Sequence, residues 1–195
     1  ARAARSAVAA GITVVAAAGN FGQGADGQER FGTVSSPGND PSVITVGSAN
    51  TKNTAVRSDD LLNTFSSRGP TRGKLTLADG TVRRDNLLKP DLVAPGNLIV
   101  GAAATRADAA TPTWNNLGAL FYPVLVTPTG ITQTYRETQM YLSGTSVSAP
   151  VVSGAAAVLL QTNPGLTPPM VKAILQYTAQ PIAGANLLQQ GAGLL

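Results

Sequence analysis

The chain has 195 residues, of which 43% are hydrophobic and 12% are charged. This length and composition predict one folded domain with a substantial core, not a disordered chain. Cysteine and histidine are both absent. Their absence excludes disulfides, thiolate metal sites and a cysteine nucleophile, and it removes the commonest general base. The formal charge of +4 comes from dispersed basic residues, so nucleic acid is not expected as a partner.

The N-terminal part of the chain reads as a helix followed by a buried strand. Residues 3–10 are rich in alanine and favour a helix, and Gly11 stands where a C-terminal cap is expected. Residues 12–17 are an apolar run, and residues 43–48 repeat this strand pattern after a polar loop. The nearly apolar stretch 7–18 is too short to cross a bilayer, so no membrane span is expected. The pattern predicts an α/β fold of three layers, with a mostly parallel sheet and helices on both faces.

The middle of the chain is rich in turn residues. Residues 78–80 (Ala-Asp-Gly) are the expected tip of a hairpin between residues 74–77 and 81–84. A further apolar strand is expected at residues 98–104. The apolar residues of segment 105–138 follow neither a helical nor a strand periodicity, so we interpret this segment as a long surface excursion.

The last third of the chain is predicted to be helical. Residues 146–161 are rich in Ala, Val and Leu, and Pro150 within them is tolerable only in an opening turn. A second helix is expected from Thr167 to about Tyr177, with Thr167 as its N-cap and two prolines in its first turn.

A run of small residues, 143–150, places Ser146 at the expected start of the long helix. Ser146 would lie among unpaired N–H groups at the positive end of the helix dipole, where an oxyanion is stabilised. The small residues beside it would let a substrate backbone approach closely. The same pattern also fits a simple Ser/Thr cap in front of a buried helix. These residues alone leave both interpretations open.

The pattern Gly144-Thr145-Ser146-x-Ser148-x-Pro150 resembles the nucleophile signature of the subtilisin-like serine proteases. In that family the serine that matches Ser146 attacks the peptide carbonyl. Residues 16–20 (Ala-Ala-Ala-Gly-Asn) resemble the strand that ends in the family's oxyanion-hole asparagine, here Asn20. Three further segments are similar to the family and occur in the right order: residues 35–38, 65–70 and 89–96.

The resemblance implies that residues 1–195 are the C-terminal portion of one subtilisin-like catalytic domain. Residues 71–88 and 105–138 would be insertions, and the fold would be incomplete at its N-terminal side. The implied activity is that of a serine endopeptidase that forms an acyl-enzyme on Ser146, with the oxyanion held by Asn20. The residues implied to contact substrate are Ala17, Ala18, Gly19, Gly144 and Thr145.

The resemblance also bears on cofactors and location. The chemistry itself is expected to need no cofactor. In relatives the aspartate that matches Asp91 can help to hold a weak structural metal ion, and calcium would suit its hard oxygen ligands. The alternative is a carboxylate that accepts hydrogen bonds from backbone N–H groups in its own turn. The family implies a secreted protein.

The family's catalytic aspartate and histidine both lie upstream of the asparagine motif, and this chain contains no histidine. Without a base the Ser146 hydroxyl stays protonated, so we expect the isolated chain to be inactive. The chain could be a piece of a longer domain, a processed chain that pairs with its N-terminal half, or a catalytically dead homologue. We favour the first, because a dead homologue has no chemical reason to keep both Ser146 and Asn20. The expected partners are a polypeptide substrate, the missing N-terminal part and, through exposed apolar surface, a second copy of the chain.

Two other classes of function fit parts of the sequence. The sedolisins use a glutamate base and would explain a chain without histidine, but they place an aspartate where this chain has Asn20. A non-catalytic binding module could use the excursion 105–138, with Trp114, Phe121 and Tyr122 as aromatic anchors.

Overall fold

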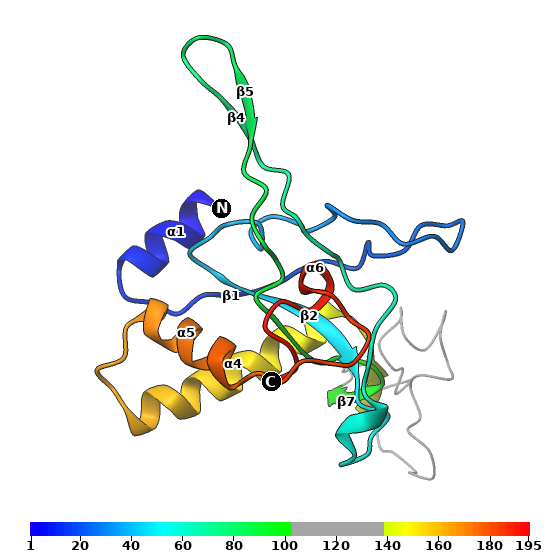
Figure 1. Cartoon of the computed structure of the whole chain (residues 1–195). Helices are drawn as coiled ribbons and strands as arrows, with labels where there is room; N and C mark the ends of the chain where they lie inside the picture. The colour runs from blue at the N-terminus through cyan, green and yellow to red at the C-terminus, as the bar shows by residue number, and fades with distance from the viewer. Residues whose placement is uncertain (103–138) are drawn as a thin grey trace, which may run out of the picture. The chain divides into compact units, whose positions relative to one another are not determined.

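The computed structural model of the chain describes residues 1–102 and 139–195 (Figure 1). Two compact units can be distinguished: residues 1–97 together with 144–195, and residues 98–143. In the second unit, β7 (Ile99–Ala102) and β8 (Gln139–Leu142) form an antiparallel pair. The apolar strand expected at residues 98–104 is therefore present over residues 99–102, but it pairs with β8 and is not a strand of the main sheet.

The surface excursion expected at 105–138, and its proposed anchors Trp114, Phe121 and Tyr122, lie outside the described residues.

The main sheet of the first unit is built around β2 (Ile44–Asn50). The strands β1 (Val15–Ala17) and β6 (Leu92–Pro95) run parallel to β2, and both are in register with Val46. They therefore lie on opposite sides of β2, and the predicted parallel sheet is confirmed. A short strand, β3 (Leu61–Leu62), adds one antiparallel pairing at the end of β2. The first strand is shorter than the expected range 12–17.

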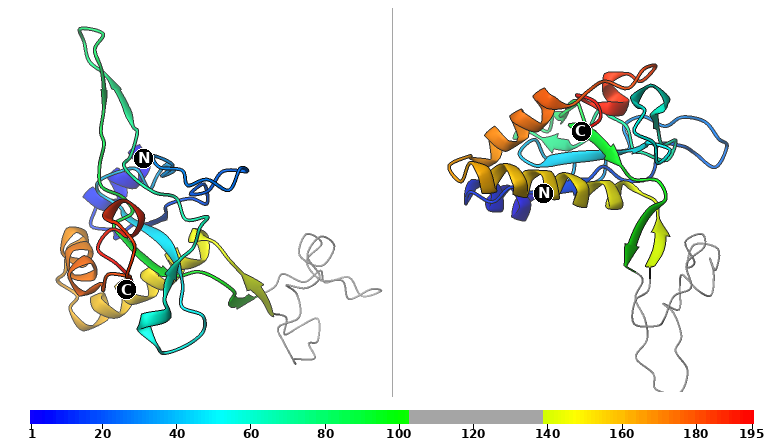
Figure 2. Two further views of the ribbon diagram at one scale, coloured as in Figure 1. Left: turned by 45° about the vertical axis from the view of Figure 1, so that its right-hand side comes forward. Right: turned by 90° about the horizontal axis from the view of Figure 1, so that it is seen from below.

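Successive side chains of β2 and β6 point to opposite faces of the sheet, and both faces are buried. On one face, Ile44, Val46, Leu92 and Ala94 pack against α4 (Thr145–Thr162) and α5 (Pro168–Thr178). On the other face, Ala49 and Val93 pack against Ile182 and Leu194 of the C-terminal segment. Figure 2 shows α4 along one side of the sheet and this segment, with α6 (Leu187–Gln190), along the other. The three-layer α/β architecture is confirmed.

The first helix, α1 (Arg2–Ala9), ends as the sequence predicts. Gly11 has a φ of 87°, in the left-handed region that favours glycine. The N–H of Ile12 donates to the carbonyl of Ala7 over 3.0 Å, and that of Gly11 donates to Val8 over 2.9 Å. These two bonds are those of a Schellman cap, which turns the chain from the helix toward β1.

The sequence predicts Pro150 in the opening turn of the long helix. This prediction is wrong, because Pro150 lies inside α4, five residues after the first residue of the helix. A proline here has no N–H to donate, so the carbonyl of Ser146, four residues earlier, is left without its usual helical donor. Thr167 stands at the N-cap of α5 as predicted, although its side chain makes no capping bond. The sequence analysis does not predict the short helix α6. In the structure Asn186 and Gln189 cap its start with reciprocal hydrogen bonds.

A hairpin formed by β4 (Lys74–Thr76) and β5 (Val82–Arg84) extends away from the main sheet (Figure 1). Its tip falls at residues 78–80 as the sequence predicts, with Gly80 at a φ of 81°. A single 3₁₀ turn, η1 (Arg57–Asp59), precedes β3.

Within the described residues, α4 alone is long and apolar enough to cross a membrane by length and composition. The core helix of a folded domain meets the same criteria, and α4 packs on β1, β2 and β6.

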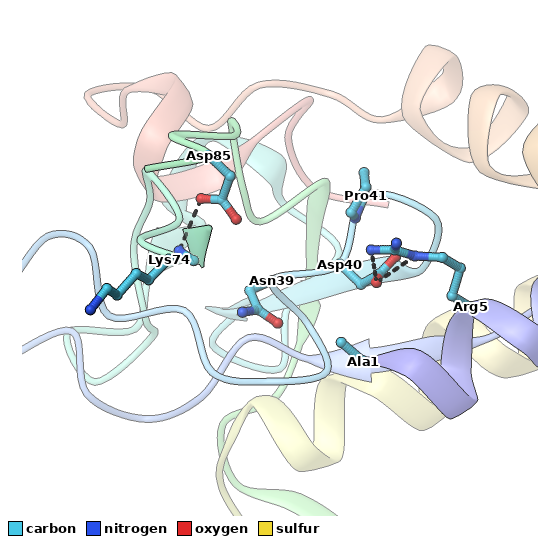
Figure 3. Close-up of a pocket in the computed structure, with 8 residues that line it drawn as sticks. Ala1, Arg5, Asn39, Asp40, Pro41, Lys74 and Asp85 are labelled. Atoms are coloured by element: carbon cyan, nitrogen blue, oxygen red, sulfur yellow. Dashed lines mark hydrogen bonds and ion pairs between the residues drawn. The ribbon is translucent and has the colours of Figure 1, made fainter. Parts of the chain in front are cut away.

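The helix α1 is tied to the rest of the unit by a buried carboxylate. Arg5 donates from Nε and Nη2 to Oδ2 of Asp40, over 3.1 and 2.8 Å, beside a shallow pocket of about 270 Å³ (Figure 3). The side chain of Asp40 is 1% exposed. Burial by itself would raise the pKa of Asp40, but hydrogen bonds from Ser42 and the pairing with Arg5 lower it from 3.8 to about 2.

We expect Asp40→Asn to reduce the free energy of unfolding by about 2 kcal/mol at pH 7, the equivalent of the lowered pKa. Because the folded-state pKa is depressed, this stabilisation is present above about pH 4 and is lost as the pH falls toward about 2. Urea unfolding of both proteins between pH 7 and pH 2 checks this, with Asp79→Asn at the exposed hairpin tip as control. A difference between wild type and variant that stays constant over this pH range would contradict the assignment.

Candidate active site

The end of β1 and the start of α4 bring Asn20 and Ser146 together. Asn20 follows β1 by three residues, and Ser146 is the second residue of α4. The side-chain oxygen Oδ1 of Asn20 accepts hydrogen bonds from the N–H and the hydroxyl of Thr145, each over 3.0 Å. Because Oδ1 is engaged in this way, the Nδ2 donor of the same amide remains available for another acceptor.

Gly144 lies next to the two donors that could hold an oxyanion. A Cβ placed on this residue would be 3.3 Å from Nδ2 of Asn20 and 3.7 Å from the backbone nitrogen of Ser146. Both nitrogens therefore lie within 4 Å of one point, which a glycine leaves unoccupied. Its φ of 149° also lies in the region that favours glycine. Among the described residues, neither Nδ2 of Asn20 nor the N–H of Ser146 has a hydrogen-bond acceptor.

Thr145 connects the two halves of this arrangement. It is fully buried, and its hydroxyl accepts from the N–H of Gly19 over 3.1 Å while donating to Oδ1 of Asn20. The side chain therefore has no exposed surface with which to touch a substrate. The geometry supports a role for the Thr145 side chain in fixing the Asn20 amide, and any substrate contact would come from its backbone.

The three small residues before Asn20 differ in their exposure. Ala18 is fully buried, its N–H donates to Val46 over 2.9 Å, and its carbonyl accepts from Ser35 over 2.9 Å. Ala17 and Gly19 are partly exposed. Of the predicted pocket wall, Ala17 and Gly19 are thus accessible, and Ala18 is a core residue that supports them.

The Ser146 hydroxyl is exposed and has no hydrogen-bond partner in the part of the chain that the structure describes. A serine is a weak nucleophile unless a neighbouring group accepts its proton. The chain contains no histidine to do so. The site therefore brings together an exposed serine hydroxyl and two N–H donors, in a chain that has no histidine.

Asp91 lies in a different environment from that of a calcium ligand. Its Oδ2 accepts from the N–H of Thr45 over 2.7 Å and from Nζ of Lys89 over 2.6 Å, and its Oδ1 pairs with Nζ of Lys172 over 2.9 Å. Burial lowers the pKa of Lys89 from 10.5 to about 8, although Asp91 opposes this shift. Both carboxylate oxygens thus face ammonium groups that would repel a cation, and the residues do not fit a calcium ion. No cluster of three or more acidic side chains suited to a metal occurs in residues 1–102 and 139–195.

Comparison with known proteins agrees with this geometry. The profile of the Subtilase family of peptidases matches residues 1–193. The chain therefore belongs to the subtilase family. Serine protease AprX of Bacillus subtilis (strain 168) is 36% identical over 178 residues, which are 90% of this chain and 32% of AprX. Subtilisin-like protease SBT6.1 of Arabidopsis thaliana is 30% identical over 191 residues, 95% of this chain and 14% of the relative.

Solved structures share the fold. Sphericase superposes with a TM-score of 0.61 at 23% identity, and the S41 psychrophilic protease with a TM-score of 0.63 at 21% identity. Each match covers 99% of this chain and 50% of the other chain. The fold is thus subtilisin-like, and the chain spans about a third of AprX and half of these two proteases.

Proposed function

We propose that this chain supplies the nucleophile and the oxyanion-binding groups of a serine endopeptidase. The observation that carries the proposal is the pair of donors, Nδ2 of Asn20 and the N–H of Ser146, which both lie within 4 Å of one point beside Gly144. Preorganised donors of this kind stabilise the negative charge that develops on a carbonyl oxygen during acyl transfer.

In the proposed reaction, Ser146 Oγ gives its proton to a base and bonds to the carbonyl carbon of a polypeptide. The peptide C–N bond then breaks, and the leaving amine takes up the proton. Water hydrolyses the resulting ester, releases the acid and restores the hydroxyl. No step requires a metal or an organic cofactor.

The chain has no histidine to serve as the base, so in the proposed protease a polypeptide segment outside these 195 residues supplies the base and the aspartate that orients it. We therefore expect the isolated chain to be inactive. We propose that the protein is secreted, as the family resemblance implies. We expect neither nucleic acid nor a membrane as its partner.

Two surfaces next to the site suit such a segment. The helix α4 is rich in Ala, Val and Leu, yet only four of its 18 residues are buried, and Val158 is 61% exposed. A helix of this composition is normally covered on all sides. In the described residues β1 is paired on one side alone, by β2, which leaves a strand edge free to accept another strand. Because Ser146 stands at the start of α4 and β1 leads to Asn20, a segment that also covers the first turns of α4 and the free edge of β1 would reach both residues.

Mixing the chain with a subtilase segment that carries the family's aspartate and histidine tests the proposal. We expect a one-to-one complex by analytical ultracentrifugation and cleavage of a fluorogenic peptide by the complex, and neither peptide cleavage by the chain alone nor activity in a complex made with Ser146→Ala. Robust cleavage by the chain alone, or a stable complex without activity, would contradict the proposal. Self-association that persists in the presence of the segment would point instead to a second copy as the occupant of these surfaces.

A further inference from the structure

Ser67 lies against the turn that carries Asn20. It is fully buried, and it follows β3 by five residues. Its N–H donates to the carbonyl of Gly19 over 2.8 Å, and its Oγ accepts from the N–H of Phe21 over 3.1 Å. One serine thus holds the backbone immediately before and immediately after Asn20.

The same turn is held from its other side by Thr145, which bonds to the N–H of Gly19 and to Oδ1 of Asn20. The fit around Gly19 is close, because a Cβ there would lie 2.7 Å from Oγ of Ser35 and 2.9 Å from Oγ of Ser67. Thr145 fixes the amide of Asn20, whereas Ser67 fixes its main chain. The two sets of bonds come from segments that are far apart in the sequence.

We propose that Ser67 is a positioning residue for the oxyanion-binding amide of Asn20. The proposal rests on the proposed function, because its effect on catalysis is exerted through that amide. A donor contributes most to the transition state when it is already held in place, and a supporting hydrogen bond is what holds it. Among the described residues Ser67 makes no hydrogen bond to Ser146 or to the Asn20 side chain, so its contribution is expected to depend on Asn20.

Kinetics of the assembled protease test this dependence. Ser67→Ala removes the acceptor for the Phe21 N–H, and we expect kcat to fall about tenfold with KM nearly unchanged, less than the loss on removing the donor itself. Ser66→Ala is the matched control, because Ser66 is its buried neighbour and its Oγ accepts from the N–H of Ser48 over 2.9 Å, away from the turn. We expect little change in kcat for the control.

A double-mutant cycle separates positioning from a general structural role. In an Asn20→Ala background, Ser67→Ala should cost nothing further, because the group that it positions is already gone. The same loss of kcat in both backgrounds, or an equal loss from Ser66→Ala, would overturn the proposal.

A second measurement does not depend on activity. In the 195-residue chain, Ser67→Ala should accelerate hydrogen exchange of the Phe21 amide and shift the side-chain amide resonances of Asn20, while Ser66→Ala leaves both unchanged. Unchanged Phe21 exchange and Asn20 resonances in Ser67→Ala would overturn the proposal. If the assembled wild-type protein fails to cleave peptides, the proposed function fails, and this measurement still decides whether Ser67 holds Asn20.

Discussion

Replacing Asn20 with alanine is expected to lower kcat of the assembled protease by about 10²- to 10³-fold, with a small effect on KM. This magnitude is the one known for removal of the equivalent donor from a subtilisin. The effect falls on kcat because the hydrogen bond forms to the oxyanion of the transition state and not to the bound substrate. Steady-state kinetics on a peptide substrate measure it.

Asn20→Asp is the informative companion variant. A carboxylate keeps the acceptor that pairs with the N–H and hydroxyl of Thr145, so the turn should stay in place. It replaces the donor with a negative charge that would repel the oxyanion. We therefore expect kcat to fall at least as far as in Asn20→Ala. A kcat close to that of the wild type would show that Nδ2 of Asn20 does not act on the reacting oxygen.

Asp91→Asn is expected to reduce the free energy of unfolding by about 3–5 kcal/mol, the cost of removing one partner from a buried charge cluster. The amide could still accept from Thr45, but Lys89 and Lys172 would lose the negative charge between them. Lys89 is almost completely buried, so water cannot compensate for the lost partner. Urea unfolding at pH 7 measures the change.

The matched control for this prediction is Asp26→Asn. Asp26 pairs with Arg30 over 2.7 Å, yet both side chains are about half exposed. Exposed ion pairs contribute little to stability, so this variant should unfold at nearly the wild-type urea concentration. Similar destabilisation by both substitutions would contradict the account of the buried cluster, and stabilisation of the wild type by calcium that is lost in Asp91→Asn would revive the calcium site.

The sheet and its helices could largely be predicted from the sequence because their patterns are local. The continuous apolar run in β2 and the alanine-rich α1 with Gly11 at its end are each set by residues close together in the chain. The sequence analysis does not predict β6 as a strand, because residues 89–96 stand out there only as a segment similar to the family. The C-terminal segment that covers the second face, including Leu194, has a sparse apolar pattern, so its packing depends on contacts that no local pattern reveals.

For the site, the sequence predicts which residues meet but not how each is held. Ser146 and Asn20 could be paired through their motifs. The burial of Thr145 and Ala18 could not be predicted, because it depends on the approach of α4 to the end of β1. The resemblance alone suggests Asp91 as a possible calcium ligand. Its pairing with Lys172 over 2.9 Å could not be foreseen, because Lys172 lies 81 positions further along the chain. Long-range pairings of this kind leave no signal in a single sequence.

In the proposed mechanism, Nδ2 of Asn20 and the N–H of Ser146 donate to one and the same oxygen atom. A crystal structure of the assembled protease, phosphonylated with a peptidyl phosphonate, tests it most directly. We predict a covalent bond to Ser146 Oγ, with the phosphoryl oxygen about 2.7–3.1 Å from both Nδ2 of Asn20 and the backbone nitrogen of Ser146. Modification of a different residue, or a phosphoryl oxygen that points into solvent away from Asn20, would contradict the account.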